Sequence, residues 1–156
     1  MLIQDYRTSM AFLGNLHRSH SDLGFTNGCF DLLHFGHADY LQKCRKKCKF
    51  LVVAVNSDNS VQRLKGSERP IISFEDRANL LLEFRSVDLV VGFDEDTPQN
   101  LIELLRPFYL FKGADYTLEE IAGARYVIEN GGTVELIDYI EGCSTTNIIK
   151  KIKGVG

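Results

Sequence analysis

The sequence predicts an α/β protein with a Rossmann-like, doubly wound sheet of five parallel strands and helices on both faces. Short apolar segments rich in β-branched residues alternate with longer segments of helical periodicity. Strands that alternate with helices form parallel βαβ units with right-handed crossovers. The length, 156 residues, suits one compact domain. We expect this domain over residues 23–156, behind an N-terminal helical arm over residues 1–22.

The first half of the domain contains two expected strands and two expected helices. Residues 24–30 predict a short strand running into a turn, and residues 36–49 a helix whose basic C-terminal end complements the helix dipole. Residues 50–56 form a continuous apolar run, typical of a strand buried on both faces. Residues 73–84 predict the next helix, with Ser73 as its cap.

Between that strand and that helix lies the one long irregular stretch, Asn56 to Pro70. It shows neither a strand nor a helix period, so we expect a mobile functional loop there.

The same alternation continues through the second half of the chain. Pro98 falls in the first turn of a helix, where its missing N–H costs little, and Thr117 and Glu120 form a capping box. The expected strands cover residues 87–93, 108–116 and 133–139, and the expected helices cover residues 97–106, 117–132 and 144–153.

The charge balance bears on whether the protein binds nucleic acid. The net charge of −3 argues against a general nucleic-acid binder. A basic run keeps that hypothesis open, although its charges fall at the helix end opposite the expected ligand side. The run comprises Lys43, Arg45, Lys46, Lys47 and Lys49.

Targeting and cysteine patterns indicate a cytoplasmic protein. No segment approaches the roughly 18 apolar residues of a membrane helix. The start, "MLIQDYRTSM", lacks the basic and apolar segments of a secretory signal. The four cysteines fit no standard zinc spacing, so structural or incidental thiols in a reducing cytoplasm are favoured over a metal site.

Ligands of an open parallel sheet bind beyond the carboxyl ends of its strands, which here carry glycines, hydroxyls and amides. Small residues and helix starts at these ends suit a phosphate. The candidates that the first, second, fourth and fifth strands deliver there include Thr26, Asn27, Gly28, Cys29 and Phe30, then Asn56, then Lys112, Gly113 and Asp115, and lastly Ser144, Thr145 and Thr146.

Two histidines bracket a glycine at the start of the helix after the first strand. Gly36 permits a tight turn and a close ligand approach, so His34 and His37 can point into one pocket. Imidazole N–H groups stabilise negative charge that develops on a phosphate. The alternative is a partly buried pair that bonds only to the backbone.

The segment "TNGCFDLLHFGH" resembles the first signature of the H-x-G-H nucleotidyltransferase superfamily, which contains the cytidylyltransferases. The segment "EGCSTTNII" resembles its second signature, at the start of the last helix. Further segments resemble the adenylyltransferase that makes ADP-heptose, in its stand-alone form, over Phe25 to Lys153. These segments are "VAVNSD", "RLKGSERPI", "EDTPQNLI", "KGADY", "IAGARYVIENGG" and "GCSTTNIIKKI".

The resemblance implies that AMP is transferred from ATP to D-glycero-D-manno-heptose 1-phosphate, giving ADP-heptose and pyrophosphate for surface polysaccharide. Glycerol-3-phosphate cytidylyltransferases carry Arg-Thr-Glu-Gly where this chain has residues 139–142, Tyr-Ile-Glu-Gly, which weakens the cytidine alternative. A cytidylyltransferase, or a nucleotidyltransferase for another phosphorylated acceptor, stays the alternative. A non-catalytic nucleotide sensor would be marked by loss of the histidines or hydroxyls, and all are present.

The resemblance also implies roles for single residues. His34 and His37 hold the triphosphate, and Thr26 to Phe30 line the nucleotide side. Ser144, Thr145 and Thr146 serve the β- and γ-phosphates, and Lys65 either closes over them or is a solvated lysine.

Each of four other residues has two possible interpretations. Arg69 and Arg77 either bind or are solvated. Asp31 either binds or holds its turn, and Asp115 either meets the ribose or caps a helix.

Mg²⁺ is expected with ATP, held by phosphate and water. The expected partners are ATP, a sugar 1-phosphate, further copies of the chain in a homo-oligomer and a separate upstream sugar kinase, with neither nucleic acid nor membrane.

Overall fold

The computed structural model describes residues 1–138, 140 and 145–154. In these residues it contains one parallel sheet of six strands in the order β1-β4-β3-β2-β5-β6. The strands are β1 (Leu2–Ile3), β2 (Leu23–Gly28), β3 (Phe50–Asn56), β4 (Leu89–Phe93), β5 (Tyr109–Gly113) and β6 (Thr133–Ile137). The doubly wound α/β prediction is confirmed, with one strand more than expected.

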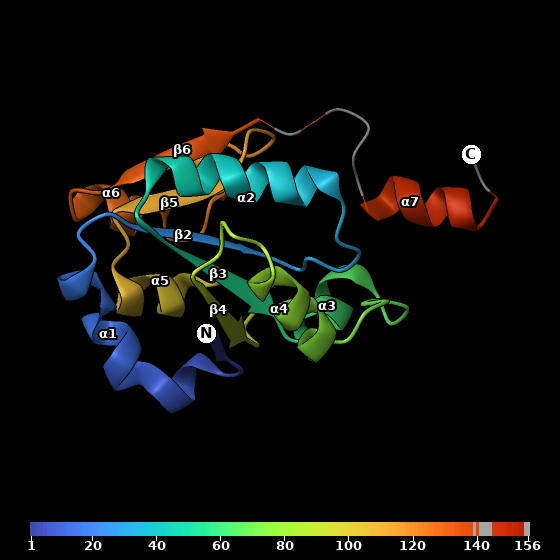
Figure 1. Cartoon of the computed structure of the whole chain (residues 1–156), viewed down its shortest axis with the longest axis horizontal. Helices are drawn as coiled ribbons and strands as arrows, with labels where there is room; N and C mark the ends of the chain where they lie inside the picture. The colour runs from blue at the N-terminus through green and yellow to red at the C-terminus, as the bar shows by residue number, and fades with distance from the viewer. Residues whose placement is uncertain (139, 141–144, 155–156) are drawn as a thin grey trace.

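Helices cover both faces of this sheet, with α2 on one side and α1 and α5 on the other (Figure 1). The α-helices are α1 (Met10–Ser19), α2 (Phe35–Lys47), α3 (Asp58–Lys65), α4 (Phe74–Leu82), α5 (Gln99–Leu105), α6 (Ala124–Glu129) and α7 (Thr145–Ile152). Two 3₁₀ helices are η1 (Tyr6–Ser9) and η2 (Leu118–Glu120). None of the helices in the described residues has the length and apolarity needed to cross a bilayer.

The core has two halves, one on each face of the sheet. Alternate residues of β3 supply both, because Val52 and Ala54 pack towards α1, α5 and α6, whereas Val53 and Val55 pack towards α2 and α4. This burial on both faces explains the uninterrupted apolar sequence of the strand.

The sixth strand, β1, comes from the segment expected as a helical arm. It pairs with β4 through Leu2↔Val90 and Ile3↔Val91. Behind it, α1 buries Leu13 and Leu16 in the same core as Leu23. Two residues carry no detectable strand period, so the sequence could not predict β1. The domain boundary expected after residue 22 stays a prediction.

The stretch from Asn56 to Pro70, expected as an irregular loop, contains helix α3. Ser57 caps this helix, since its hydroxyl accepts a hydrogen bond from the N–H of Ser60 at 3.0 Å. Among the hydrophobic side chains of α3 only Val61 is fully buried, so the segment lacks the apolar stripe by which a helix is predicted.

The helix expected over residues 117–132 is broken into η2 and α6. The capping box is present, with the Glu120 carboxylate accepting from the Thr117 N–H at 2.9 Å. The break falls at Gly123, whose φ of +82° lies in the left-handed region and cannot continue a helix.

The close approach of Gln4 to β4 yields a prediction. A Cβ atom built on Gly92 would lie 1.9 Å from the carbonyl oxygen of Gln4. Gly92→Ala must therefore displace the backbone after β1, and we expect it to lower the free energy of unfolding by about 1–3 kcal/mol in urea denaturation.

Gly14→Ala is the matched control, because Gly14 lies in α1 and its built Cβ meets only the Leu104 side chain, at 3.2 Å. This control should be neutral or stabilising, since alanine favours helix. A Gly92→Ala protein as stable as the parent would contradict the placement of β1.

Candidate active site

A pocket of about 510 Å³ opens where the sheet order reverses, between β2 and β5. Pairing between β2 and β5 covers only Gly24↔Tyr109 and Phe25↔Leu110, whereas β2 stays paired with β3 as far as Gly28. The two strands thus separate towards their carboxyl ends, and the pocket fills the space.

Most of the predicted site residues meet at this pocket. Those that line it are Asn27, Gly28, Cys29, Phe30, His37, Asn56, Lys65, Lys112, Thr145 and Thr146. Those that do not are Thr26, His34, Gly36, Gly113 and Asp115. Ser144 lies outside the described residues.

The two histidines lie against each other at the start of α2. Their ring centroids are 4.0 Å apart, and Phe30 lies 5.4 Å from the ring of His37. His34 is the N-cap of the helix, where its Nδ1 accepts a hydrogen bond from the N–H of Gly36 at 3.1 Å. This bond assigns the proton of a neutral His34 to Nε2, which leaves that N–H as a donor.

Both histidines are held in the neutral form. Burial lowers the pKa of His34, and burial together with the neighbouring His34 lowers the pKa of His37 to about 4. At neutral pH the pair therefore offers N–H donors without a fixed positive charge.

Two buried polar atoms at the pocket have no hydrogen-bond partner within the part of the chain that the structure describes. They are Oδ1 of Asn27 and Nδ1 of His37. A buried polar atom left without a partner costs about 1–3 kcal/mol. Such atoms are tolerated at sites where a polar ligand completes the bonding.

The end of the chain reaches the same place through α7. The Thr145 hydroxyl donates to the carbonyl of Leu32 at 3.2 Å, two residues before His34. Thr145 and Thr146 line the pocket from the first turn of α7, which extends away from the rest of the molecule (Figure 1). Helix starts from opposite ends of the sequence thus meet beside one pocket.

Arg77 lies behind the pocket, fully buried. Its guanidinium donates to the carbonyl of Ile72 at 3.0 Å, to the carbonyl of Asn56 at 2.9 Å, to the carboxylate of Asp58 at 2.8 Å and to the carbonyl of Cys29. The sequence left Arg77 open as a binding or a solvated residue, and the structure shows a third role. Arg77 positions the segments that form the wall of the pocket.

The carboxylate of Asp31 links the turn after β2 to the segment that precedes α4. Its carboxylate accepts from the N–H groups of Ile71 at 2.8 Å and Ile72 at 3.0 Å and from Arg69 at 2.5 Å. Burial alone would raise the pKa of Asp31, but these bonds outweigh it and lower the pKa. The carboxylate therefore stays charged, and it fixes Arg69 at the edge of the pocket.

The pocket also contains residues that the sequence analysis missed. They are Tyr40, Leu64, Asp96, Thr97, Pro98, Tyr116, Glu120 and Ala122. Tyr40 shares a 2.9 Å hydrogen bond with Thr26, which explains why Thr26 is buried beneath the site. Asp96 to Pro98 follow β4, so the strand-end rule applied to that strand would have found them.

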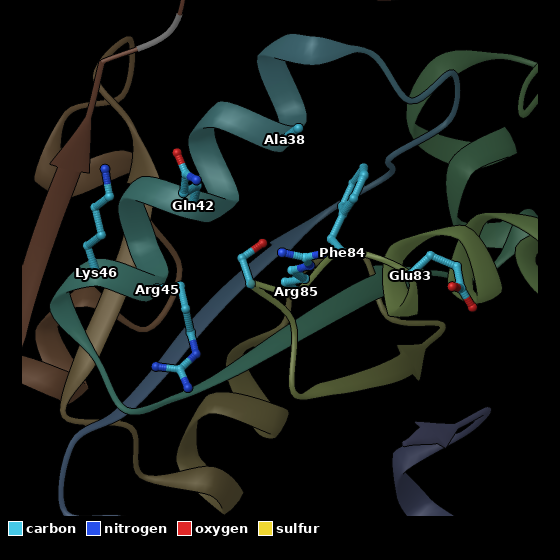
Figure 2. Close-up of a pocket in the computed structure, with 8 residues that line it drawn as sticks. Ala38, Gln42, Arg45, Lys46, Glu83, Phe84 and Arg85 are labelled. Atoms are coloured by element: carbon cyan, nitrogen blue, oxygen red, sulfur yellow. The ribbon is translucent and has the colours of Figure 1, made fainter.

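A separate hollow of about 540 Å³ lies between α2 and residues 83–86 and shares no lining residue with the pocket. Figure 2 shows Gln42, Arg45 and Lys46 projecting from α2, and Phe84 and Arg85 from the segment before β4.

The basic run that kept the nucleic-acid hypothesis open is largely paired with carboxylates. Its ion pairs are Lys43–Asp39, Arg45–Asp88, Lys47–Glu135 and Lys49–Asp22. Paired cations offer little free charge to a phosphate backbone, which argues further against nucleic acid.

The comparison with protein families matches residues 25–151 to the family described as cytidylyltransferase-like. Among known proteins, the chain is similar to "Bifunctional protein HldE" of Granulibacter bethesdensis, with 58% identity over 130 residues, which are 83% of this chain and 27% of that protein. The HldE protein of Campylobacter fetus is 55% identical over 137 residues, 88% of this chain and 29% of that protein. The chain thus spans little more than a quarter of these relatives.

Solved structures share the fold. A lipopolysaccharide core biosynthesis protein of Thermoplasma volcanium superposes with a TM-score of 0.60 and 27% identity, covering 76% of this chain and 95% of that one. Pantothenate synthetase of Thermus thermophilus superposes with a TM-score of 0.65 at 19% identity, covering 94% of this chain and 66% of that one.

The buried guanidinium yields a prediction for stability. Arg77→Lys keeps the charge but cannot reach all four acceptors, so several buried oxygens lose their donors. We expect the free energy of unfolding to fall by about 3 kcal/mol, measured by urea denaturation.

Arg125→Lys is the control, since Arg125 is exposed and pairs with Glu129 in the next helical turn. Its unfolding midpoint should not move. An Arg77→Lys protein as stable as the parent would show that one ammonium suffices to hold the wall.

Proposed function

Because this chain belongs to the cytidylyltransferase-like family, we propose that it is a nucleotidyltransferase that transfers AMP from ATP to D-glycero-D-manno-heptose 1-phosphate. The products are ADP-heptose and pyrophosphate. One observation carries the proposal: His37 in the first turn of α2, with His34 against it, and the threonines at the start of α7 meet at a single pocket that His37 and the threonines line. The likeness to HldE proteins, at 55–58% identity, and to a lipopolysaccharide core biosynthesis protein supports the choice of acceptor.

The reaction requires alignment and charge stabilisation rather than a strong base. A phosphate oxygen of the sugar 1-phosphate attacks the α-phosphorus of ATP in line, and the bond to the β-phosphate breaks as pyrophosphate leaves. The attacking phosphate is already ionised at pH 7, because its second pKa is about 6. The protein therefore has to hold two anions together and to stabilise the charge between them.

The pocket supplies neutral and charged donors for this task. His37 offers an N–H group in the pocket, and His34, whose ring lies against that of His37, offers another beside it. Because both imidazoles are neutral, neither has an internal ion pair that must break when a phosphate binds. Thr145 and Thr146 add hydroxyls. Lys65 lies at the C-terminal end of α3, exposed and without an ion pair among the described residues, so it is free to close over the triphosphate.

Mg²⁺ is proposed as the companion of ATP, where it would neutralise phosphate charge. Among the described residues no group of three or more histidine, cysteine or acidic side chains is arranged to hold a metal. Mg²⁺ is commonly carried by phosphate oxygens and water together with one or two carboxylates.

The proposed setting follows from the substrates. A kinase that phosphorylates the sugar has to supply a sugar 1-phosphate acceptor, and we propose that this kinase is a separate protein and that both reactions use the ATP of the cytoplasm. A homo-oligomer is proposed as the assembled form.

The second candidate is a cytidylyltransferase, or a nucleotidyltransferase that acts on a different phosphorylated acceptor, because the family that the chain matches is cytidylyltransferase-like.

The test crosses the four nucleoside triphosphates with several sugar 1-phosphates and measures pyrophosphate release. The proposal expects release with ATP and the heptose 1-phosphate, together with ADP-heptose as product. Release with CTP and not with ATP would replace it by the second candidate.

A further prediction concerns His37. Replacing His37 with alanine removes an N–H donor from the charge that develops during transfer, so kcat should fall by about a hundredfold or more while the fold persists. Steady-state kinetics and thermal unfolding measure the two effects.

His20→Ala is the matched control, since His20 lies outside the pocket and stacks on Phe50 at 4.2 Å. It should retain the parent kcat. If His37→Ala also retained it, the histidine pair would have no part in the chemistry.

A further inference from the structure

Lys112 occupies the point at which the sheet divides. It lies in β5 with Leu136 of β6 as its register partner, but β2 no longer pairs with β5 at this level. It lines the pocket at the level where the two strands have separated.

Among the described residues, this ammonium lacks a carboxylate partner of the kind that Asp31 provides for Arg69. Arg69 pairs with Asp31 at 2.5 Å, whereas Lys112 forms no ion pair within the described part of the chain. The ammonium lies over the ring of Tyr116, 5.2 Å from the ring centroid. A ring face stabilises a cation only modestly, so the charge at this position is poorly compensated.

The groups around Lys112 explain its acid–base behaviour. Among the described residues, the titratable groups near it are Cys29 after β2 and Asp115 and Tyr116 after β5. Strand β6 opposes it with the apolar Leu136. Burial lowers the pKa of Lys112 to about 8, because Cys29 and the Asp115 carboxylate offset the lost hydration only in part.

We propose that Lys112 binds a phosphate of one substrate directly and that this binding is coupled to proton uptake by its amine. A phosphate oxygen at this point supplies the missing opposite charge, which favours the ammonium over the neutral amine. Above pH 8 the free protein has lost this proton to a large extent, so the amine takes one from solvent when the substrate binds. Below pH 7 it already carries the proton, and uptake there is small.

The inference rests on the proposed function only for the identity of the two substrates. The phosphate belongs either to ATP or to the sugar 1-phosphate, and separate binding experiments distinguish these. Calorimetry follows ATP with Mg²⁺ alone, and then the heptose 1-phosphate in the presence of an ATP analogue with a methylene bridge between its α- and β-phosphates.

Each titration is made at pH 7, 8 and 9 with the parent protein, Lys112→Met and Lys112→Arg. Methionine keeps the length of the side chain without its charge, and arginine keeps the charge throughout this range. We expect Lys112→Met to bind the relevant substrate about tenfold or more weakly at pH 7. The parent should weaken severalfold from pH 8 to pH 9, and both variants should show no such slope.

Proton uptake is measured at pH 9 from the binding heat in buffers of different ionisation enthalpy. The parent should take up a substantial fraction of a proton in the affected titration, and Lys112→Met should take up none. Lys46→Met, which removes the same charge from the separate hollow on α2, should behave as the parent.

Loss of affinity only with ATP would assign Lys112 to the nucleotide, and loss only with the sugar phosphate would assign it to the acceptor. Unchanged affinity and slope in both titrations would overturn the inference. Because binding is measured without turnover, the two proposals fail separately. Lys112-dependent ATP binding without ADP-heptose formation would refute only the acceptor, whereas ADP-heptose formation with parent-like binding by Lys112→Met would refute only the role of Lys112.

Discussion

The pocket depends on one buried guanidinium. Parallel strands end with carbonyl groups that have no further ladder partner, and a buried carbonyl needs a donor. Arg77 supplies donors to Cys29 beyond β2 and to Asn56 at the end of β3, and it also holds Asp58 at the start of α3. Because one planar guanidinium donates to all three residues, the segments that form the wall of the pocket keep a fixed spacing.

That fixed wall explains how distant parts of the sequence can share a ligand. The turn after β2 leads directly to the histidines, and Thr145 at the start of α7 is bonded to the same turn through Leu32. The separation of β2 and β5 then provides depth, and Lys112 of β5 lines the pocket at that level. The donors around the pocket are imidazoles, hydroxyls and amines, a set that suits a polyanion and leaves some buried polar atoms to be satisfied by it.

The sequence allowed the main strands and the pocket to be predicted because both follow from local patterns. The strand expected over residues 50–56 is β3, since burial on both faces leaves a continuous apolar run. Helix α3 buries too little to be recognised, and β1 is too short. The break at Gly123 depends on a backbone angle that no periodicity reveals. The burial of Arg77 was equally hidden, because a helix-face arginine is usually solvated and only the fold shows the carbonyls around it.

The central claim is that the start of α2 and the start of α7 bind one and the same triphosphate. The most direct measurement is a crystal structure with Mg²⁺ and a non-hydrolysable ATP analogue. The account predicts phosphate oxygens of one nucleotide within hydrogen-bond distance of both His37 and the hydroxyl of Thr145 or Thr146. A nucleotide that contacts only one of these segments, or two molecules held separately by them, would contradict it.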